Sequence, residues 1–378
     1  MTKQNTRYID EELEKEEEMD KINDLDENNF FILKKRQSLI FSPNNKKFDG
    51  LDSLIKFNQE RRGSQISLGE LSSNSEIPIN IVGNIITNPE KLKLISQEGL
   101  IPEFEIDDFE YLNPIGEGSY GKIYSVENIY DESRYALKKI ICHDLKEVKL
   151  IQSNLELIYS KQHEHIMKII GVEYKCLDIT TYSLYILMEL ALSDWNDEIK
   201  RRFKEKKYYT ENEIIDIIKQ IIKPLIYLEN EGIAHRDIKP QNILIFENNI
   251  YKITDFGEMK ILSDSVQEST LRGSQLYMSP VLYNGLKYNQ RDVIHNAYKS
   301  DVYSLGFCLI YALTLNINIL SSLRDIISMK VMSSMISKNI KKYYSSKMIY
   351  LITKMLELDE RERFSFQEVE NYIKENYC

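Results

Sequence analysis

The pattern of apolar and polar positions divides the chain near residue 104. After this point, three short runs rich in β-branched and aromatic residues are separated by turn residues, which predicts consecutive antiparallel strands. These runs are Phe109–Ile115, Ile123–Val126 and Tyr135–Ile140. Beyond about residue 211 the apolar positions repeat at helical spacing. The expected helices cover Glu213–Glu231, with an interruption at Pro224, then Val302–Leu313 and Lys347–Leu358. We therefore expect an α+β fold, with a β-rich part followed by a helical part.

The first 104 residues show no such period. Few of their apolar residues recur at helical or strand spacing, and residues 1–30 carry 4 basic and 11 acidic side chains. A charged run of this kind is usually solvated, so we expect residues 1–104 to form an acidic, mostly disordered extension. One short helix is predicted within it, because Asn88 can cap the helix, Pro89 suits its first position and Gly99 can end it.

Composition excludes one class of partner and indicates a compartment. In 378 residues, hydrophobic side chains make up 42% and charged ones 29%, which is typical of a soluble globular protein. The net charge of −10 offers no broad basic face, so we expect no nucleic-acid partner. The four cysteines show no metal-ligand spacing and are typical of reduced thiols. We therefore expect a cytoplasmic protein, with the nucleus as the alternative.

One uncharged stretch is long enough to cross a membrane. Val302–Leu323 contains 22 residues without a charged side chain. It also contains several Ser, Thr and Asn side chains, which a membrane span tolerates poorly unless they have a function. A buried helix of a soluble protein is therefore the favoured interpretation, and we predict no membrane insertion.

Three glycines follow the first predicted strand. Gly116, Gly118 and Gly121 have the spacing G-x-G-x-x-G, which alone fits a dinucleotide fold or an ordinary turn. A dinucleotide fold needs a helix directly afterwards, whereas the next residues here are typical of a strand, and Lys138 lies on the strand after that. A glycine-rich hairpin lets backbone amides approach phosphates, and a lysine on a neighbouring strand can reach the same phosphates. This arrangement favours a nucleoside triphosphate.

A second motif is more specific. The run HRDIKPQN extends from His235 to Asn242, and Asp255-Phe256-Gly257 begins 18 residues after Asp237. Phosphoryl transfer to a hydroxyl group needs a carboxylate that orients the hydroxyl and accepts its proton. It also needs hard oxygen ligands that hold magnesium against the phosphates. Asp237 fits the first requirement, and Asn242 and Asp255 fit the second.

With these motifs in this order, residues 105–378 resemble the eukaryotic protein kinase family, serine/threonine type. The resemblance implies a two-lobed fold, with a β-rich N-lobe over about 105–188, a hinge over about 189–194 and a mainly helical C-lobe over about 195–378. It implies ATP and Mg²⁺ as cofactors and protein Ser/Thr hydroxyl groups as acceptors. The sequence does not indicate the protein substrate or the oligomeric state.

The resemblance also assigns roles to single residues. The catalytic residues are Asp237, Lys239 and Lys138, and the metal ligands are Asn242 and Asp255. The ATP site comprises Ile115, Gly116, Gly118, Gly121, Ile123, Ala136, Lys138, Met188, Glu189, Ala191 and Leu244. Asp301 corresponds to the buried carboxylate that braces the catalytic loop. His235 and Phe256, with Ile158 and Ile169, correspond to an apolar stack that connects the lobes.

Residues between Asp255 and Pro280 predict the regulation of the site. Ser274 matches the hydroxyl residue that bonds the catalytic Asp and Lys in serine/threonine kinases. Thr270 occupies the usual position of activation-loop phosphorylation, where a phosphate pairs with Arg236. The alternative is that Thr270 is an unmodified loop residue.

The sequence departs from the family pattern at two positions. The helix position that normally holds the glutamate partner of the lysine falls on Asn154, and Glu156 would lie on a different face. Either the helix is offset in register or Lys138 lacks its usual ion pair. The usual Ala-Pro-Glu is Ser-Pro-Val here, ending at Val281, although its basic partner Arg363 remains. We expect a salt bridge of the C-lobe to be lost.

The segment Tyr283–Lys299 is longer than usual, and a surface loop is favoured over a docking element.

These features leave two functions from different classes. An active protein kinase is favoured because Lys138, Asp237, Asn242 and Asp255 are all present. The alternative is a pseudokinase that acts as an ATP-binding scaffold or allosteric partner. A small-molecule kinase is disfavoured by Lys239, Ser274 and the full segment between Asp255 and Pro280.

Overall fold

The computed structural model describes residues 101–118, 121–262 and 265–377. The predicted extension up to residue 100, including its short helix after Asn88, lies outside the described residues. The packing of the described chain begins at Ile101, which is buried. The carbonyl of Pro102 accepts a hydrogen bond from the Val172 N–H at 3.0 Å, so residues just before the expected boundary at 104 already contact the N-lobe.

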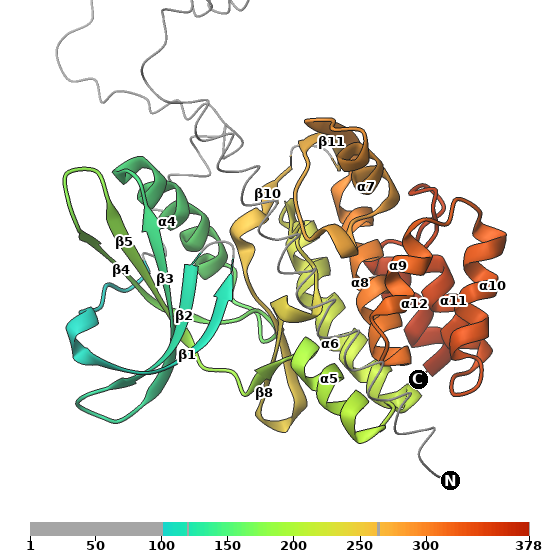
Figure 1. Ribbon diagram of the computed structural model, residues 1–378, viewed down its shortest axis with the longest axis horizontal. Coiled ribbons are helices and arrows are strands. Elements are labelled where there is room, and N and C mark those ends of the chain that lie inside the picture. The colour runs from blue at the N-terminus through green and yellow to red at the C-terminus, as the bar shows by residue number, and fades with distance from the viewer. Residues whose placement is uncertain (1–100, 119–120, 263–264, 378) are drawn as a thin grey trace, which may run out of the picture. The chain divides into compact units, whose positions relative to one another are not determined.

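The N-lobe is built on a five-stranded antiparallel sheet with the order β1-β2-β3-β5-β4 (Figure 1). Its strands are β1 (Phe109–Gly118), β2 (Gly121–Asn128), β3 (Arg134–Cys142), β4 (Ile169–Cys176) and β5 (Tyr182–Glu189). Alternation with period two sends Leu184 and Ile186 of β5 to the face that packs with helix α4 (Leu145–Ser160), and Leu187 to the opposite face. The Asp144 side chain caps α4 by accepting the Glu147 N–H.

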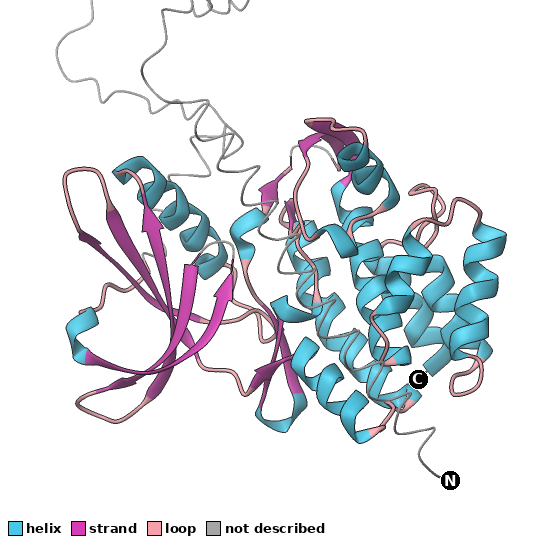
Figure 2. Ribbon diagram, viewed as in Figure 1, coloured by secondary structure: helices cyan, strands magenta, loops and turns pink. Residues whose placement is uncertain are grey.

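The C-lobe is mainly helical (Figure 2). Its helices are α5 (Trp195–Glu205), α6 (Glu211–Asn230), α7 (Pro280–Lys287), α8 (Ala297–Thr314), α9 (Asn318–Arg324), α10 (Met329–Ile340), α11 (Ser346–Met355) and α12 (Phe366–Tyr377). Helix α8 is buried along nearly its whole length and forms the centre of the lobe. The uncharged stretch is divided between α8 and α9. None of the described helices combines the length and the apolar character needed to cross a membrane.

The expected interruption at Pro224 was wrong, because α6 continues through this residue. Thr210 and Glu213 form a reciprocal capping box at the start of α6, and Pro224 is buried in its packed face. Burial of the apolar stripe along α6 offsets the loss of one backbone hydrogen bond at the proline.

Three small sheets complete the C-lobe. They are β6 (Ser193–Asp194) with β8 (Ile243–Phe246) and β9 (Ile250–Ile253), then β7 (Ile233–Ala234) with β10 (Lys260–Ile261), and β11 (Val266–Thr270) with β12 (Asp292–Asn296). The third sheet corrects the expectation of a surface loop over Tyr283–Lys299. This segment contains the end of α7, β12 and the start of α8, and it pairs with β11. Val293 and His295 point inward while Ile294 is exposed, and this alternation is too short to stand out in the sequence.

Candidate active site

The glycines lie in a hairpin, as predicted, because β1 and β2 pair antiparallel with Gly118 opposite Gly121. Gly121 has φ +144°, and a Cβ atom there would lie 2.1 Å from the carbonyl oxygen of Lys139. Only glycine fits this position, because the backbone of β3 occupies the space of a side chain. Residues 119–120 lie outside the described residues.

Lys138 of β3 reaches across to the C-lobe. Its Nζ lies 2.9 Å from Oδ1 of Asp255, which precedes a short 3-10 turn at Phe256–Glu258. Burial alone would raise the pKa of Asp255, but the Lys138 ammonium holds the pKa below its ordinary value. The backbone of Asp255 is left-handed, with φ 61°, a strained conformation for a residue with a side chain. The carboxylate is therefore ionised and fixed beside the lysine.

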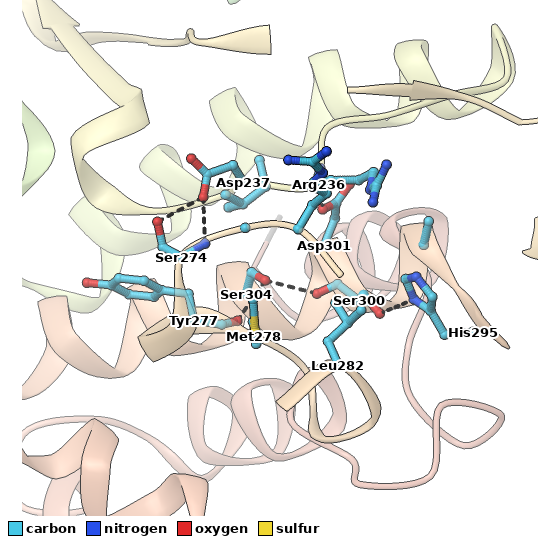
Figure 3. A pocket seen from close by; sticks show the side chains of 14 residues that line it. Arg236, Asp237, Ser274, Tyr277, Met278, Leu282, His295, Ser300, Asp301 and Ser304 are labelled. Carbon is cyan, nitrogen blue, oxygen red and sulfur yellow. Dashed lines mark hydrogen bonds between the residues drawn. The ribbon is translucent and has the colours of Figure 1, made fainter. Parts of the chain in front are cut away.

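The carboxylate of Asp237 is held by three side chains of the C-lobe. Oδ1 accepts from both the backbone N–H and Oγ of Ser274, each at 2.9 Å (Figure 3). Oδ2 accepts from Nδ2 of Asn242 at 3.0 Å and lies 3.3 Å from Nζ of Lys239. The same Nζ donates to Oγ of Ser274 at 2.9 Å. The structure thus brings together the predicted base, its lysine and the predicted hydroxyl residue.

Asp301 fixes the backbone just before Asp237. Its two carboxylate oxygens accept the N–H groups of His235 and Arg236, each at 2.9 Å. Burial raises the pKa of Asp301 to about 7, against the opposing effect of these hydrogen bonds. Arg236, like Asp255, has a left-handed backbone, with φ 70°. The predicted brace is present.

The residues predicted to surround the nucleotide belong to, or pack against, one hydrophobic core. Ala136 is buried, and Ile123 and Leu244 pack against the same core, which joins both lobes. The ring of His235 lies 5.0 Å from that of Phe256, centroid to centroid. Ile158, Ile169 and Phe256 belong to the same core.

The hinge after Met188 contains an ion pair that the sequence did not indicate. The side chain of Glu189 lies 2.7 Å from Nζ of Lys252 on β9 and accepts the Lys168 N–H at 2.7 Å. The backbone N–H of Glu189 donates to the Lys168 carbonyl at 3.2 Å, so this N–H is engaged within the protein. Lys252 precedes Asp255 by three residues, but no spacing rule connects a strand lysine to the hinge.

One cation contacts Thr270 and a second contacts its neighbour Ser269. Nη2 of Arg236 donates to the Thr270 carbonyl and lies 3.5 Å from Oγ1 of the same residue. Nζ of Lys260 donates to Oγ of the neighbouring Ser269 at 3.1 Å. Burial, and then the nearby charge of Arg272, lower the pKa of Arg236 to about 10. Arg236 therefore stays cationic at neutral pH, next to the predicted phosphorylation site.

The two departures from the family pattern have different structural outcomes. Among the described residues, the side chains of Asn154 and Glu156 form no hydrogen bond or ion pair, while Lys138 pairs with Asp255. Val281 stands where the family pattern has the glutamate that pairs with Arg363. Arg363 donates instead to the carbonyls of three residues, Lys299, Glu357 and Leu358.

Comparison with known proteins identifies the fold. A model of the protein kinase domain matches residues 109–373. The chain belongs to the protein kinase family. A probable serine/threonine-protein kinase nek2 from Dictyostelium discoideum is 34% identical over 54% of this chain and 48% of its own length. The mouse serine/threonine-protein kinase Nek4 is 30% identical over 70% of this chain and 32% of its own.

The mouse kinase Nek2 is 28% identical over 70% of this chain and 59% of its own length. The chain thus spans less than two thirds of each of these relatives.

Protein kinases in general use ATP with Mg²⁺, and the residues present fit such a metal. Asn242 donates through Nδ2 to Asp237, which leaves its amide oxygen for a cation, and Asp255 supplies a second hard oxygen ligand. The Thr254 N–H donates to the Asn242 carbonyl at 3.0 Å and ties the two ligand-bearing segments together.

Proposed function

We propose that the protein is a serine/threonine protein kinase that transfers the γ-phosphoryl group of ATP to Ser or Thr hydroxyl groups of protein substrates. The observation that carries this proposal is the arrangement around Asp237. One oxygen of its carboxylate is held by Ser274 and the other by Asn242 and Lys239. The names of the relatives, which are serine/threonine kinases, support the same acceptor class.

The roles of the residues follow from these contacts. Asp237 accepts a hydrogen bond from the acceptor hydroxyl and directs its oxygen toward the phosphorus atom. Lys239 stabilises negative charge that develops next to that carboxylate. Lys138 contacts the phosphates from the N-lobe, while its pairing with Asp255 keeps the lobes in register. When bound, Mg²⁺ would be held by Asn242 and Asp255 and would neutralise charge on the phosphates.

A pseudokinase is the alternative function. Two observations weigh against it, because Lys138 is engaged at the site and Arg363 donates three hydrogen bonds to backbone carbonyls. Both departures are therefore compatible with an assembled catalytic site. We further propose a cytoplasmic location, protein substrates with no nucleic-acid partner, and Thr270 as a site of phosphorylation.

The test is phosphoryl transfer from radiolabelled ATP with Mg²⁺ to generic protein substrates, with wild type and Asp255→Asn compared. Wild type is expected to label the substrates, and Asp255→Asn should reduce labelling by at least about a hundredfold, because a metal ligand and the partner of Lys138 are lost together. A wild-type chain that binds ATP, measured by a fluorescent analogue, but labels neither the substrates nor itself would favour the pseudokinase.

A further inference from the structure

Strand β12 forms a backbone ladder with the activation segment, which we define by the described residues 255–262 and 265–280. Val266 lies opposite Asn296, and the pairing continues without a bulge to Thr270 opposite Asp292. The Leu271 N–H donates to the Arg291 carbonyl at 3.3 Å. Hydrogen-bonded pairs recur at every second residue of an antiparallel ladder, so the next bonded pair is Ser269 with Val293.

The buried face of β12 supports the later part of the same segment. Val293 is buried and packs with Met278 and Leu282, which flank the Ser279 turn. Helix α7 approaches so closely that a Cβ atom on Gly285 would lie 2.6 Å from Cγ1 of Val293. Strand β12 therefore packs against residues on both sides of Ser279 and against α7.

His295 connects β12 to the helix that braces the catalytic loop. It is 1% exposed, and its Nδ1 lies 2.8 Å from Oγ of Ser300 (Figure 3). The Ser300 hydroxyl lies 3.0 Å from that of Ser279, at the end of the activation segment. Ser300 directly precedes Asp301 on α8. One buried chain of polar groups thus joins β12, the activation segment and the brace of Asp237.

A phosphate on Thr270 would meet opposing charges. Arg236 lies on one side, where it already donates to the Thr270 carbonyl. Asp292 lies opposite Thr270 in the ladder, in a pair that is not hydrogen-bonded, and such pairs bring their side chains closest together. The carboxylate of Asp292 lies 3.9 Å from Nε of Arg291, which offsets part of its charge. The remaining negative charge would repel a phosphate across the ladder and reduce its gain from Arg236.

We propose that β12, anchored by the buried His295, is a positioning element that holds the activation segment in its catalytic arrangement without a phosphate on Thr270. The backbone ladder, the Val293 packing and the His295–Ser300 bond are all made by unmodified groups. The proposal rests on the proposed kinase activity. It predicts that the unphosphorylated chain is active and that its activity depends on β12.

The experiment uses the full chain after phosphatase treatment, with mass spectrometry to verify that Thr270 is unmodified. The treated wild type should keep at least about half of its kcat/KM, because the ladder replaces the ordering effect of a phosphate. Val293→Pro removes the backbone N–H and should lower kcat at least about tenfold with little change in the KM for ATP. The matched control Val293→Ala also removes the buried valine side chain but keeps the backbone N–H. Its kcat should fall by no more than about threefold.

Hydrogen exchange supplies a readout that does not depend on activity. The amides of Ser269 and Leu271 should be protected in the treated wild type and exchange faster in Val293→Pro. If that variant does not fold, Gly285→Ala replaces it. Alanine favours helix α7, but its Cβ atom displaces Val293. We therefore expect faster exchange at the same amides and a fall in kcat of at least about threefold.

Three results would overturn the proposal: loss of activity by more than about twentyfold on phosphatase treatment, Val293→Pro within about twofold of wild type, or unprotected amides at Ser269 and Leu271. A chain that is inactive both before and after treatment would contradict the proposed kinase function instead. In that case the exchange measurement still decides whether β12 holds the activation segment.

Discussion

Lys138 and Arg363 are two basic residues that the family pattern pairs with glutamates, and in this chain neither expected glutamate is present. In the N-lobe, Asn154 stands at the expected position, and Lys138 pairs with Asp255 across the lobes at 2.9 Å. In the C-lobe, Val281 stands at the expected position. Arg363 is 1% exposed, donates to three backbone carbonyls and lies 4.9 Å from the centre of the Tyr303 ring.

The difference follows from what each cation does. A buried guanidinium needs hydrogen-bond acceptors in the folded state, and backbone carbonyls supply them without a second buried charge. Burial lowers the pKa of Arg363 to about 10, so the group remains charged at neutral pH. Lys138 instead pairs with Asp255, a carboxylate that the proposed function assigns to the metal site. In place of a glutamate, Arg363 thus has backbone acceptors, whereas Lys138 has a carboxylate of the candidate active site.

The largest effect is expected at the reacting groups. Lys138→Met and Asp237→Asn should each reduce kcat/KM at least about a hundredfold, because each removes a group that acts on phosphate or hydroxyl in the transition state. Steady-state kinetics with ATP and a peptide substrate measures this. Lys139→Met is the matched control, since Lys139 is adjacent on β3 and lies over the ring of Tyr185. Activity within about twofold of wild type in either variant would refute the catalytic assignment.

Arg363→Met tests the buried hydrogen bonds that Arg363 donates in the C-lobe. Three carbonyls lose their donor in a buried region, so the free energy of unfolding should fall by about 3 kcal/mol. Chemical denaturation measures this fall, and the kcat of the folded fraction should change little because Arg363 does not contact the site. Arg361→Met is the control, because Arg361 pairs with Asp359 at the surface. Equal changes in the unfolding midpoint of both variants would show that the buried bonds of Arg363 contribute little.

The buried His295 of β12 predicts that the stability of the C-lobe depends on pH. Burial, and then the charge of Arg236, lower the pKa of His295 to about 4. Between the ordinary histidine pKa and this value, the unfolded chain binds more protons, so folded stability falls as the pH falls through this window. Between pH 7 and about pH 5, the free energy of unfolding should fall by about 2 kcal/mol more in wild type than in His295→Gln. Urea unfolding at both pH values measures this, and parallel losses would mean that His295 does not titrate there.

Much of the fold was predictable because local patterns agree with the tertiary structure. The three predicted strands lie within β1, β2 and β3, and the predicted helices lie largely within α6, α8 and α11. Helix starts such as that of α8 were missed by several residues, because its first turn is capped by Asn296 before the uncharged run begins. The contacts of Ser274 with Asp237 and Lys239 were predictable because the spacing of these motifs is specific.

The remaining features depend on contacts between distant segments. The pairing of Glu189 with Lys252 joins residues 63 positions apart, and neither has a local signal. Strand β12 was missed because it is short and has polar flanks, and its stability comes from the ladder with β11. The compensation at Arg363 uses backbone carbonyls, which every residue carries, so the sequence could show only the lost glutamate.

The smallest effect is expected at helix α4. Asn154→Glu should maintain or raise kcat/KM, by up to about fivefold, because a carboxylate there would restore an ion pair for Lys138 in a partly solvated site. Glu156→Gln should be nearly neutral. Burial raises the pKa of Glu156, and among the described residues its carboxylate forms no ion pair that the change would break. Kinetics of both variants measures these effects.

The control is the double variant of Asn154→Glu with Lys138→Met, in which any gain from the new carboxylate should disappear, because its partner is absent. A gain that persists without Lys138 would mean that the glutamate acts through helix stability. A large loss of activity in Glu156→Gln alone would show that α4 presents Glu156 to Lys138 during the reaction. The comparison between the lobes would then change, because Lys138 would keep a glutamate of its own and only Arg363 would have lost one.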